Sequence, residues 1–315
     1  MITKIFKRLS IFSYIVSFFL TLAVNLFDLY SRNAAEIYPG LFQRALTISS
    51  GLIIIIVMVS LSATKKINTK FGAEHLLSFP VCLLLFYQDA GLNYQKLFLG
   101  IILVIALNIF SKDWSKGNSN KALFSLGCLF TITSFINSYF SIFFISTLLI
   151  IIRLNNKRSA IFSLLIGVFM TLQSLAIVTY LLTGKFLYAP PAKFLESIPL
   201  NRIINGTELV WIIMVILAFI SAFYLKRVKR RGSHFIRFEG GDNFMLFWLV
   251  TSVVFRIFNL YVGGGIWLLS FIPTAFFIGK AYKTIKKDAI KEVLVLLLVC
   301  FGIVFKLYEN GVFIN

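Results

Sequence analysis

The stretch from Ala122 to Ile152 constrains the fold of this chain more than any other, because it holds no charged residue and is closed by Lys121 and Arg153. As a single helix it would be about 46 Å long, whereas the hydrocarbon core of a bilayer is about 30 Å thick. The stretch is therefore either one tilted membrane span or a hairpin of two short helices that turns at Ile136-Asn137-Ser138.

The composition of the whole chain is typical of a helical membrane protein. Of its 315 residues, 59% are hydrophobic and 14% are charged, and the mean hydropathy is +0.89. Soluble domains carry about a quarter charged residues. The apolar residues form repeated blocks long enough to cross a bilayer. We therefore expect an all-α polytopic bundle that forms a single integral membrane domain over residues 1–315.

The basic residues decide between the span and the hairpin. Fourteen of those after Ile152 fall on one side of the predicted topology and four on the other. A single span would place the fourteen outside, although Lys4, Lys7 and Arg8 indicate a cytoplasmic N-terminus. The charges favour the hairpin and a membrane protein with about eleven crossings, N-terminus inside and C-terminus outside. This placement accounts for the net charge of +19 without nucleic acid.

The hairpin halves are expected to be helices of about 14 to 16 residues, short for a bilayer. Such short helices should lie against longer neighbours, with Asn137 and Ser138 in a polar recess where a ligand or partner would bind. The other predicted spans are Leu9–Phe27, Ala45–Ser62, Leu76–Tyr87, Leu97–Phe110, Ala160–Thr183, Leu209–Leu225, Phe244–Tyr261, Ile266–Ala281 and Val293–Leu307.

The segment Lys121–Lys185 resembles the centre of a family of uncharacterised multi-pass inner-membrane proteins of Bacteroidota, a domain of unknown function. The residues that carry this resemblance are Asn120-Lys121, Gly127, the break at Asn137-Ser138, Arg153, the turn Asn155–Arg158, Gly167 and Tyr180. The resemblance implies a multi-pass membrane protein and no particular activity.

The overall plan also resembles membrane glycosyltransferases of the GT-C type, which use lipid-phosphate sugar donors. Asp28 and Glu36 stand in the outer loop that carries the catalytic acid in that family, and spans 3–4 and 5–6 resemble its short paired helices. The resemblance implies a GT-C-like module over about residues 1–185, followed by C-terminal helices over about 208–315. The short outer loops depart from that family, and a fold of this kind does not by itself carry the reaction.

Asp28 and Glu36 are the candidate catalytic residues. A carboxylate at an outer helix end is suited to act as a general base or to bind a divalent cation. The alternative is an interfacial loop in which these carboxylates pair with Arg32 and Arg44 at little energetic consequence.

Arg256, Arg202 and Arg44 are the candidate phosphate- or lipid-binding residues. Arg256 falls within a predicted span, where a cation costs at least about 2.5–3.5 kcal/mol at the helix centre. It should therefore face a carboxylate, a water-filled cavity or a phosphate. The alternative is that its side chain reaches the outer interface, close to Tyr261.

A basic cluster is predicted to contact anionic lipid headgroups on the inner side, or to act only as a topological signal. Its residues are Lys226, Arg227, Lys229, Arg230 and Arg231. No metal site is predicted, because His75 and His234 lack a second ligand at helical spacing and the three cysteines lack CxxC spacing. No cofactor is indicated.

These observations favour a non-catalytic partner or scaffold in cell-envelope biogenesis, whose partners are membrane lipids and other membrane proteins. The first alternative is a GT-C-like enzyme that uses a polyprenyl-phosphate-linked sugar. The second is a transporter, although no convincing internal repeat supports it.

Overall fold

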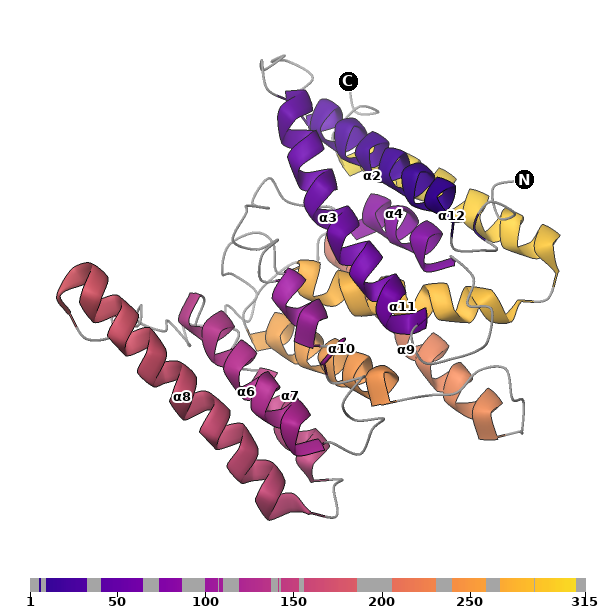
Figure 1. Ribbon diagram of the computed structural model, residues 1–315. Coiled ribbons are helices and arrows are strands. Elements are labelled where there is room, and N and C mark those ends of the chain that lie inside the picture. Colours follow the sequence, from indigo (N-terminus) through magenta and orange to yellow (C-terminus); the bar gives the residue numbers. More distant parts are fainter. Residues whose placement is uncertain are drawn as a thin grey trace. The chain divides into compact units, whose positions relative to one another are not determined.

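In the computed structural model, every element with assigned bounds in the described part of the chain is an α-helix, as predicted (Figure 1). The described residues are 6, 10–32, 41–64, 74–86, 100–106, 108–109, 119–136, 141, 143–152, 156–185, 206–230, 240–258, 267–285 and 287–309. The helices are α2 (Ile11–Arg32), α3 (Leu41–Thr64), α4 (Glu74–Phe86), α6 (Ser119–Ile136), α7 (Phe143–Ile151), α8 (Lys157–Thr183), α9 (Gly206–Arg230), α10 (Gly240–Phe258), α11 (Trp267–Thr284) and α12 (Asp288–Glu309).

These helices lie where the apolar blocks predict them. The ends of the predicted spans move by only a few residues: Leu9–Phe27 becomes α2, and Ala160–Thr183 becomes α8. For the span expected at Leu97–Phe110, residues 100–106 and 108–109 are helical. The number of membrane crossings and the orientation of the N-terminus stay predictions.

The charge-free stretch forms two helices, as the basic residues predict. Helix α6 ends at Ile136, and α7 begins at Phe143. The ring centroids of Phe130 and Phe143 are 5.9 Å apart, so the chain has turned back beside α6. The halves are less equal than expected, at 18 and 9 residues. The predicted recess at Asn137 and Ser138 lies outside the described residues.

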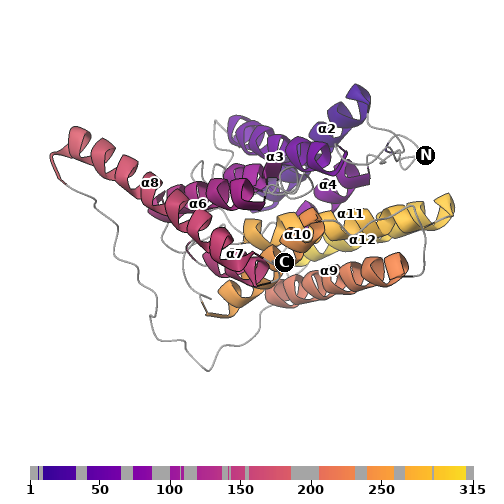
Figure 2. The same cartoon turned by 60° about the horizontal axis from the view of Figure 1, so that its bottom comes forward.

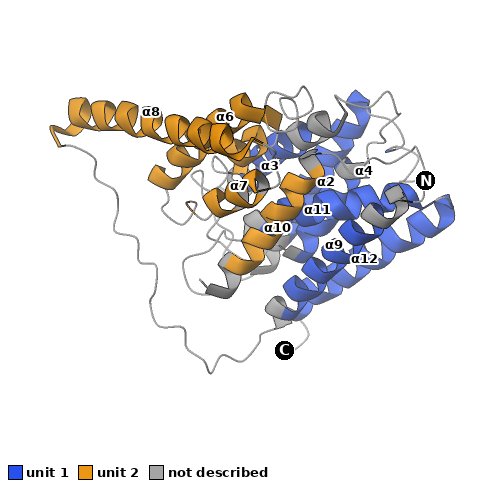
Figure 3. Cartoon of the chain, turned by 90° about the horizontal axis from the view of Figure 1, so that it is seen from below, with its two compact units in different colours: residues 1–97, 201–237, 263–315 blue, residues 98–200, 238–262 orange. Residues whose placement is uncertain are grey.

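The chain divides into two compact units, coloured separately in Figure 3. Unit 1 comprises residues 1–97, 201–237 and 263–315, and unit 2 comprises residues 98–200 and 238–262. Each unit is thus assembled from segments that are separate in the sequence. The predicted module boundary between residues 185 and 208 stays a prediction.

Helix α4 is the centre of unit 1. Every residue from Leu76 to Leu85 is buried, and α2, α3, α9, α11 and α12 all contact this helix. A helix that is apolar on all sides is stable only when other elements surround it. The interior Pro80 is tolerated here because neighbouring helices shield the backbone group it leaves unpaired. The aromatic rings of Phe79 and Phe271 meet edge to face at 5.5 Å.

Unit 2 joins the pair α6–α8 to α7 and α10. Helices α6 and α8 run side by side in Figures 1 and 2. The fully buried Trp248 of α10 meets the rings of Phe143 and Phe244 edge to face, at 6.0 and 6.2 Å. This aromatic cluster fixes the short helix α7 against its neighbours.

Candidate functional site

The structure describes the backbone, but not the side chains, of several predicted site residues. Asp28 lies near the end of α2, Arg44 near the start of α3, and Arg256 near the end of α10. Helix α9 extends through the basic cluster to Arg230. The structure also leaves undescribed the side chains of Glu36, His75, Arg202, Arg231 and His234. The roles expected for all of these residues stay predictions.

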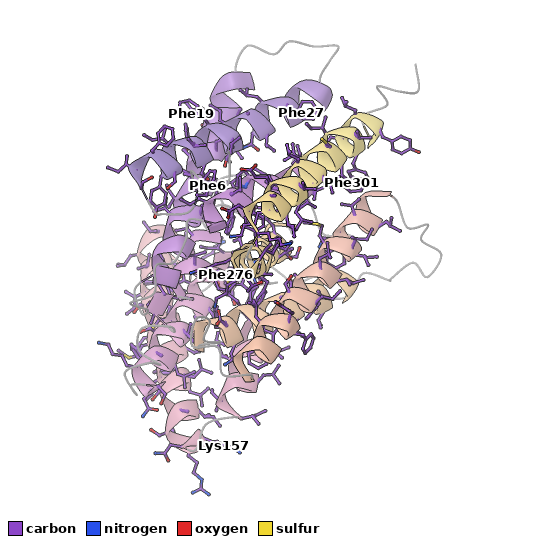
Figure 4. All side chains as sticks on the ribbon, turned by 90° about the vertical axis from the view of Figure 1, so that its right-hand side faces the viewer. Phe6, Phe19, Phe27, Lys157, Phe276 and Phe301 are labelled. Atoms are coloured by element: carbon purple, nitrogen blue, oxygen red, sulfur yellow. The ribbon has the colours of Figure 1, made fainter. Side chains whose placement is uncertain are left out.

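Helix α2 buries a stripe of small polar side chains. Ser13, Ser17, Thr21 and Asn25 recur every four residues, and each is fully buried. Residues at this spacing share one face of a helix. The opposite faces carry large apolar side chains, such as Phe19, which is 61% exposed and labelled in Figure 4. The helix therefore turns its polar face inward and its apolar faces outward.

The buried polar groups of unit 1 join one helix to another. Asn25 Nδ2 donates to Ser49 Oγ at 2.8 Å and links α2 to α3. Further contacts are those from Ser17 Oγ to the Leu76 carbonyl at 2.7 Å, from Ser78 Oγ to the Ala275 carbonyl at 2.9 Å, and from Trp211 Nε1 to Ser270 Oγ at 2.8 Å. They link α2 to α4, α4 to α11, and α9 to α11. In these hydrogen bonds the polar side chains hold neighbouring helices together.

Helices α9 and α12 also expose large apolar side chains. The buried face of α9 is apolar as well, with Val210, Met214 and Ala218. The exposed apolar residues of α9 and α12 include Leu209, Ile213, Ile216, Ile220, Phe223, Val293, Leu297, Phe301 and Val304. On α12, a Cβ at Gly302 would come within 2.6 Å of Leu84 Cδ2, so this glycine faces α4.

Two glycines set the closest approach in unit 2, between α6 and α8. A Cβ at Gly127 would come within 2.5 Å of the Leu164 carbonyl oxygen, and one at Gly167 would overlap the Phe124 carbonyl oxygen. Only residues without a side chain allow two helix backbones to approach this closely. The pair is also joined by Asn120 Nδ2, which donates to Ser159 Oγ at 2.7 Å.

Among the described residues, α8 is the helix that is long and apolar enough to cross a membrane. Its buried face is limited to Ala160, Leu164 and Gly167. The helix ends at Gly184, whose φ of 69° is left-handed and whose N–H donates to the Tyr180 carbonyl at 2.8 Å. Its exposed apolar residues include Phe162, Leu165, Ile166, Phe169, Met170, Leu172, Ile177, Val178, Leu181 and Leu182.

Three lysines of unit 1 are buried, although the sequence places them at the ends of predicted spans or in the loops between them. Lys280, Lys291 and Lys306 lie on α11 and α12 and are 5%, 9% and 1% exposed. Lys280 Nζ lies 5.4 Å from the centroid of the Phe276 ring, and Lys291 Nζ lies 5.5 Å from that of Tyr282. The ammonium groups of Lys280 and Lys291 therefore each have an aromatic face beside them.

The described residues contain no group of three or more His, Cys, Asp or Glu side chains that could hold a metal ion. Cys82 is buried, Cys128 is partly buried and Cys300 is exposed, all three as free thiols. Comparisons with family models, with curated proteins and with solved structures find no match to this chain.

Proposed function

We propose that this chain is a multi-pass protein of the bacterial inner membrane, which acts as a non-catalytic partner or scaffold in cell-envelope biogenesis. The observation that carries the proposal is the large apolar surface on the outside of the helices. Large apolar residues cover the outer faces of α2, α8, α9 and α12, and small polar residues are buried between α2 and its neighbours.

The energetics of this surface support a lipid environment. A large apolar side chain gains about 1.5–3 kcal/mol when it leaves water. A soluble chain that exposed the apolar faces of α8, α9 and α12 to water would lose this transfer free energy at many residues. In a bilayer, the same side chains leave water by contacting lipid tails. Inside a bilayer, close packing at small residues and interhelical hydrogen bonds hold helices together.

The scaffold role is supported by the use of the buried polar groups. The contacts Asn25–Ser49, Ser17–Leu76 and Ser78–Ala275 all hold one helix to another. Such groups stabilise an arrangement of helices rather than act on a substrate. The wide apolar face of α8 offers a further membrane helix a surface on which to pack.

The experiment that tests the proposal has two stages. Membranes from cells that express the full chain are washed with alkaline carbonate, which releases peripheral proteins but not integral ones. The chain is then extracted in mild detergent, and its mass is measured by native electrophoresis and light scattering. We expect it to stay in the carbonate pellet and to migrate as an assembly larger than the 35.8 kDa chain.

Release by carbonate would exclude the membrane-embedded arrangement. A monomer that retains a polyprenyl lipid would exclude the scaffold role and favour the enzyme.

The enzyme is the second candidate because of the position of Asp28. The buried stripe of α2 ends at Asn25, and Asp28 is three residues further along the same helix, near its end. A carboxylate near the end of a helix is suited to act as a general base. This candidate predicts transfer of sugar from a polyprenyl-phosphate donor to an acceptor by the purified chain. Asp28→Asn should abolish the transfer and leave membrane integration unchanged.

A further inference from the structure

Gln173 is an exposed amide in the middle of the most apolar helix. It lies 15 residues after Arg158 and 12 before Lys185, or about 22 Å and 18 Å along α8. In the proposed bilayer, its carboxamide is therefore close to the midplane. An amide without a hydrogen-bond partner in hydrocarbon costs several kcal/mol. The residue is exposed, and no hydrogen bond to its side chain is found among the described residues.

Gln173 also belongs to a regular seam. Phe162, Ile166, Phe169, Gln173, Ala176 and Tyr180 follow one another at intervals of four and three residues. This is the spacing at which a helix presents one face to a partner helix in a left-handed pair. All six are at least partly exposed, and Phe169 is 67% exposed. At about 100° per residue, Gln173 is about 120° around α8 from Gly167, so the seam faces away from α6.

We propose that α8 pairs through this seam with α8 of a second copy of the chain, in an interface centred on Gln173. The proposal rests on the membrane location proposed above. Two features select a second copy as the occupant. A carboxamide holds both a donor and an acceptor, so two of them related by a two-fold axis satisfy each other. A single polar residue in an apolar seam is also the device that fixes the register of paired helices.

Lipid tails and an unrelated apolar helix do not provide this match. Lipid tails hold no hydrogen-bonding group, and an apolar helix would leave the amide unpaired. The position of Gln173 within the seam, rather than the apolar surface itself, identifies the partner.

The test uses the full chain fused to a fluorescent protein and reconstituted in vesicles of phosphatidylethanolamine and phosphatidylglycerol. The dimer fraction is counted by single-molecule photobleaching over a range of protein-to-lipid ratios. Gln173→Leu removes the amide but keeps the apolar face, and should raise the dimer dissociation constant about tenfold through the loss of two interhelical hydrogen bonds.

The matched control is the double variant Leu172→Gln/Gln173→Leu, which has the same composition. It moves the amide about 100° around the helix and off the seam. It should therefore weaken the dimer as much as Gln173→Leu does.

Cysteine cross-linking supplies a second readout. In a chain that carries Cys128→Ala and Cys300→Ser, Ala176→Cys places a thiol on the seam and Val178→Cys places one at nearly the same depth on the other side of α8. With copper phenanthroline as the oxidant, the first should give a disulfide-linked dimer and the second should not.

A monomeric wild-type chain at the highest protein-to-lipid ratio would overturn the proposal. So would a double variant that pairs as well as the wild type, or equal cross-linking at the two positions. Flotation of the same vesicles after a carbonate wash separates the two proposals. A monomer that remains in the vesicles contradicts only the pairing of α8, whereas a chain lost from the vesicles contradicts the membrane location as well.

Discussion

Individual residues set the distances between helices, and the closest approach described above is at Gly127 and Gly167. Gly167→Ala places a methyl group against the Phe124 carbonyl, and Gly127→Ala places one 2.5 Å from the Leu164 carbonyl oxygen. Backbone atoms move aside less readily than side chains, so each substitution should lower the unfolding free energy by about 1–3 kcal/mol. Thermal unfolding of the purified chain in detergent measures this loss.

Gly302→Ala is the control for these glycines. Its new methyl group would meet the flexible side chain of Leu84 rather than a backbone. The loss should therefore be smaller than at Gly167. Equal losses at Gly302 and Gly167 would contradict the close backbone approach of α6 and α8.

The pair Asn25–Ser49 is the second prediction at the scale of residues. The hydrogen bond from Asn25 Nδ2 to Ser49 Oγ is buried and joins α2 to α3. A double-mutant cycle with Asn25→Ala and Ser49→Ala should give a coupling energy of about 0.6 kcal/mol and at most about 1.7 kcal/mol, the mean and the maximum for interhelical hydrogen bonds in a membrane protein. Unfolding by sodium dodecyl sulfate measures the four stabilities, and strict additivity would show that the bond contributes nothing.

The sequence contains a signal for this polar stripe. Ser13, Ser17, Thr21 and Asn25 recur every four residues in an otherwise apolar block, which indicates a face turned toward other helices. The burial of Lys306 has no such signal. A lysine near a span end is ordinarily expected to reach the interface, and only the packing around α12 buries it.

At the scale of elements, a substitution on the exposed face of α8 has different consequences in a membrane protein and in a soluble one. Met170 is 52% exposed and lies close to the middle of the helix. Met170→Arg would be nearly neutral in water, but it costs about 2.5–3.5 kcal/mol at the centre of a bilayer. We expect the variant to lose most of its membrane-inserted population.

Flotation of membranes and protease protection measure that population, with Met170→Leu as the control. A Met170→Arg chain that inserts as well as this control would place the exposed face of α8 outside the hydrocarbon.

The positions of the helices could be predicted because each apolar block must either span or be buried. The charge-free stretch was divided correctly, since only a hairpin keeps the later basic residues on one side. The nine-residue length of α7 was not predictable in this way. It depends on contacts of Phe143 with Phe130 and with Trp248, which lie 13 and 105 positions away along the chain.

At the scale of the whole molecule, the assignment of helices to the two units is the feature that the sequence could not predict. Helices α9 and α11 pack together in unit 1, whereas α10, which lies between them in the sequence, packs with α7 in unit 2. Lipid tails are as apolar as leucine, so an apolar face does not reveal whether it meets lipid or another helix. Which helices pack together is therefore determined by their shapes and by a few polar contacts, such as the one between Trp211 and Ser270.

The predicted orientation of the molecule in the membrane can be tested at the two ends of α8. Asn156 and Lys185 are both exposed and flank the helix. The hairpin topology places Asn156 in the cytoplasm, beside Lys157 and Arg158, and Lys185 outside. In a chain that carries Cys300→Ser, Lys185→Cys should react with a membrane-impermeant maleimide in intact spheroplasts, and Asn156→Cys only after lysis. A single span over Ala122–Ile152 would reverse both results, because one crossing fewer before α8 inverts it together with every helix that follows.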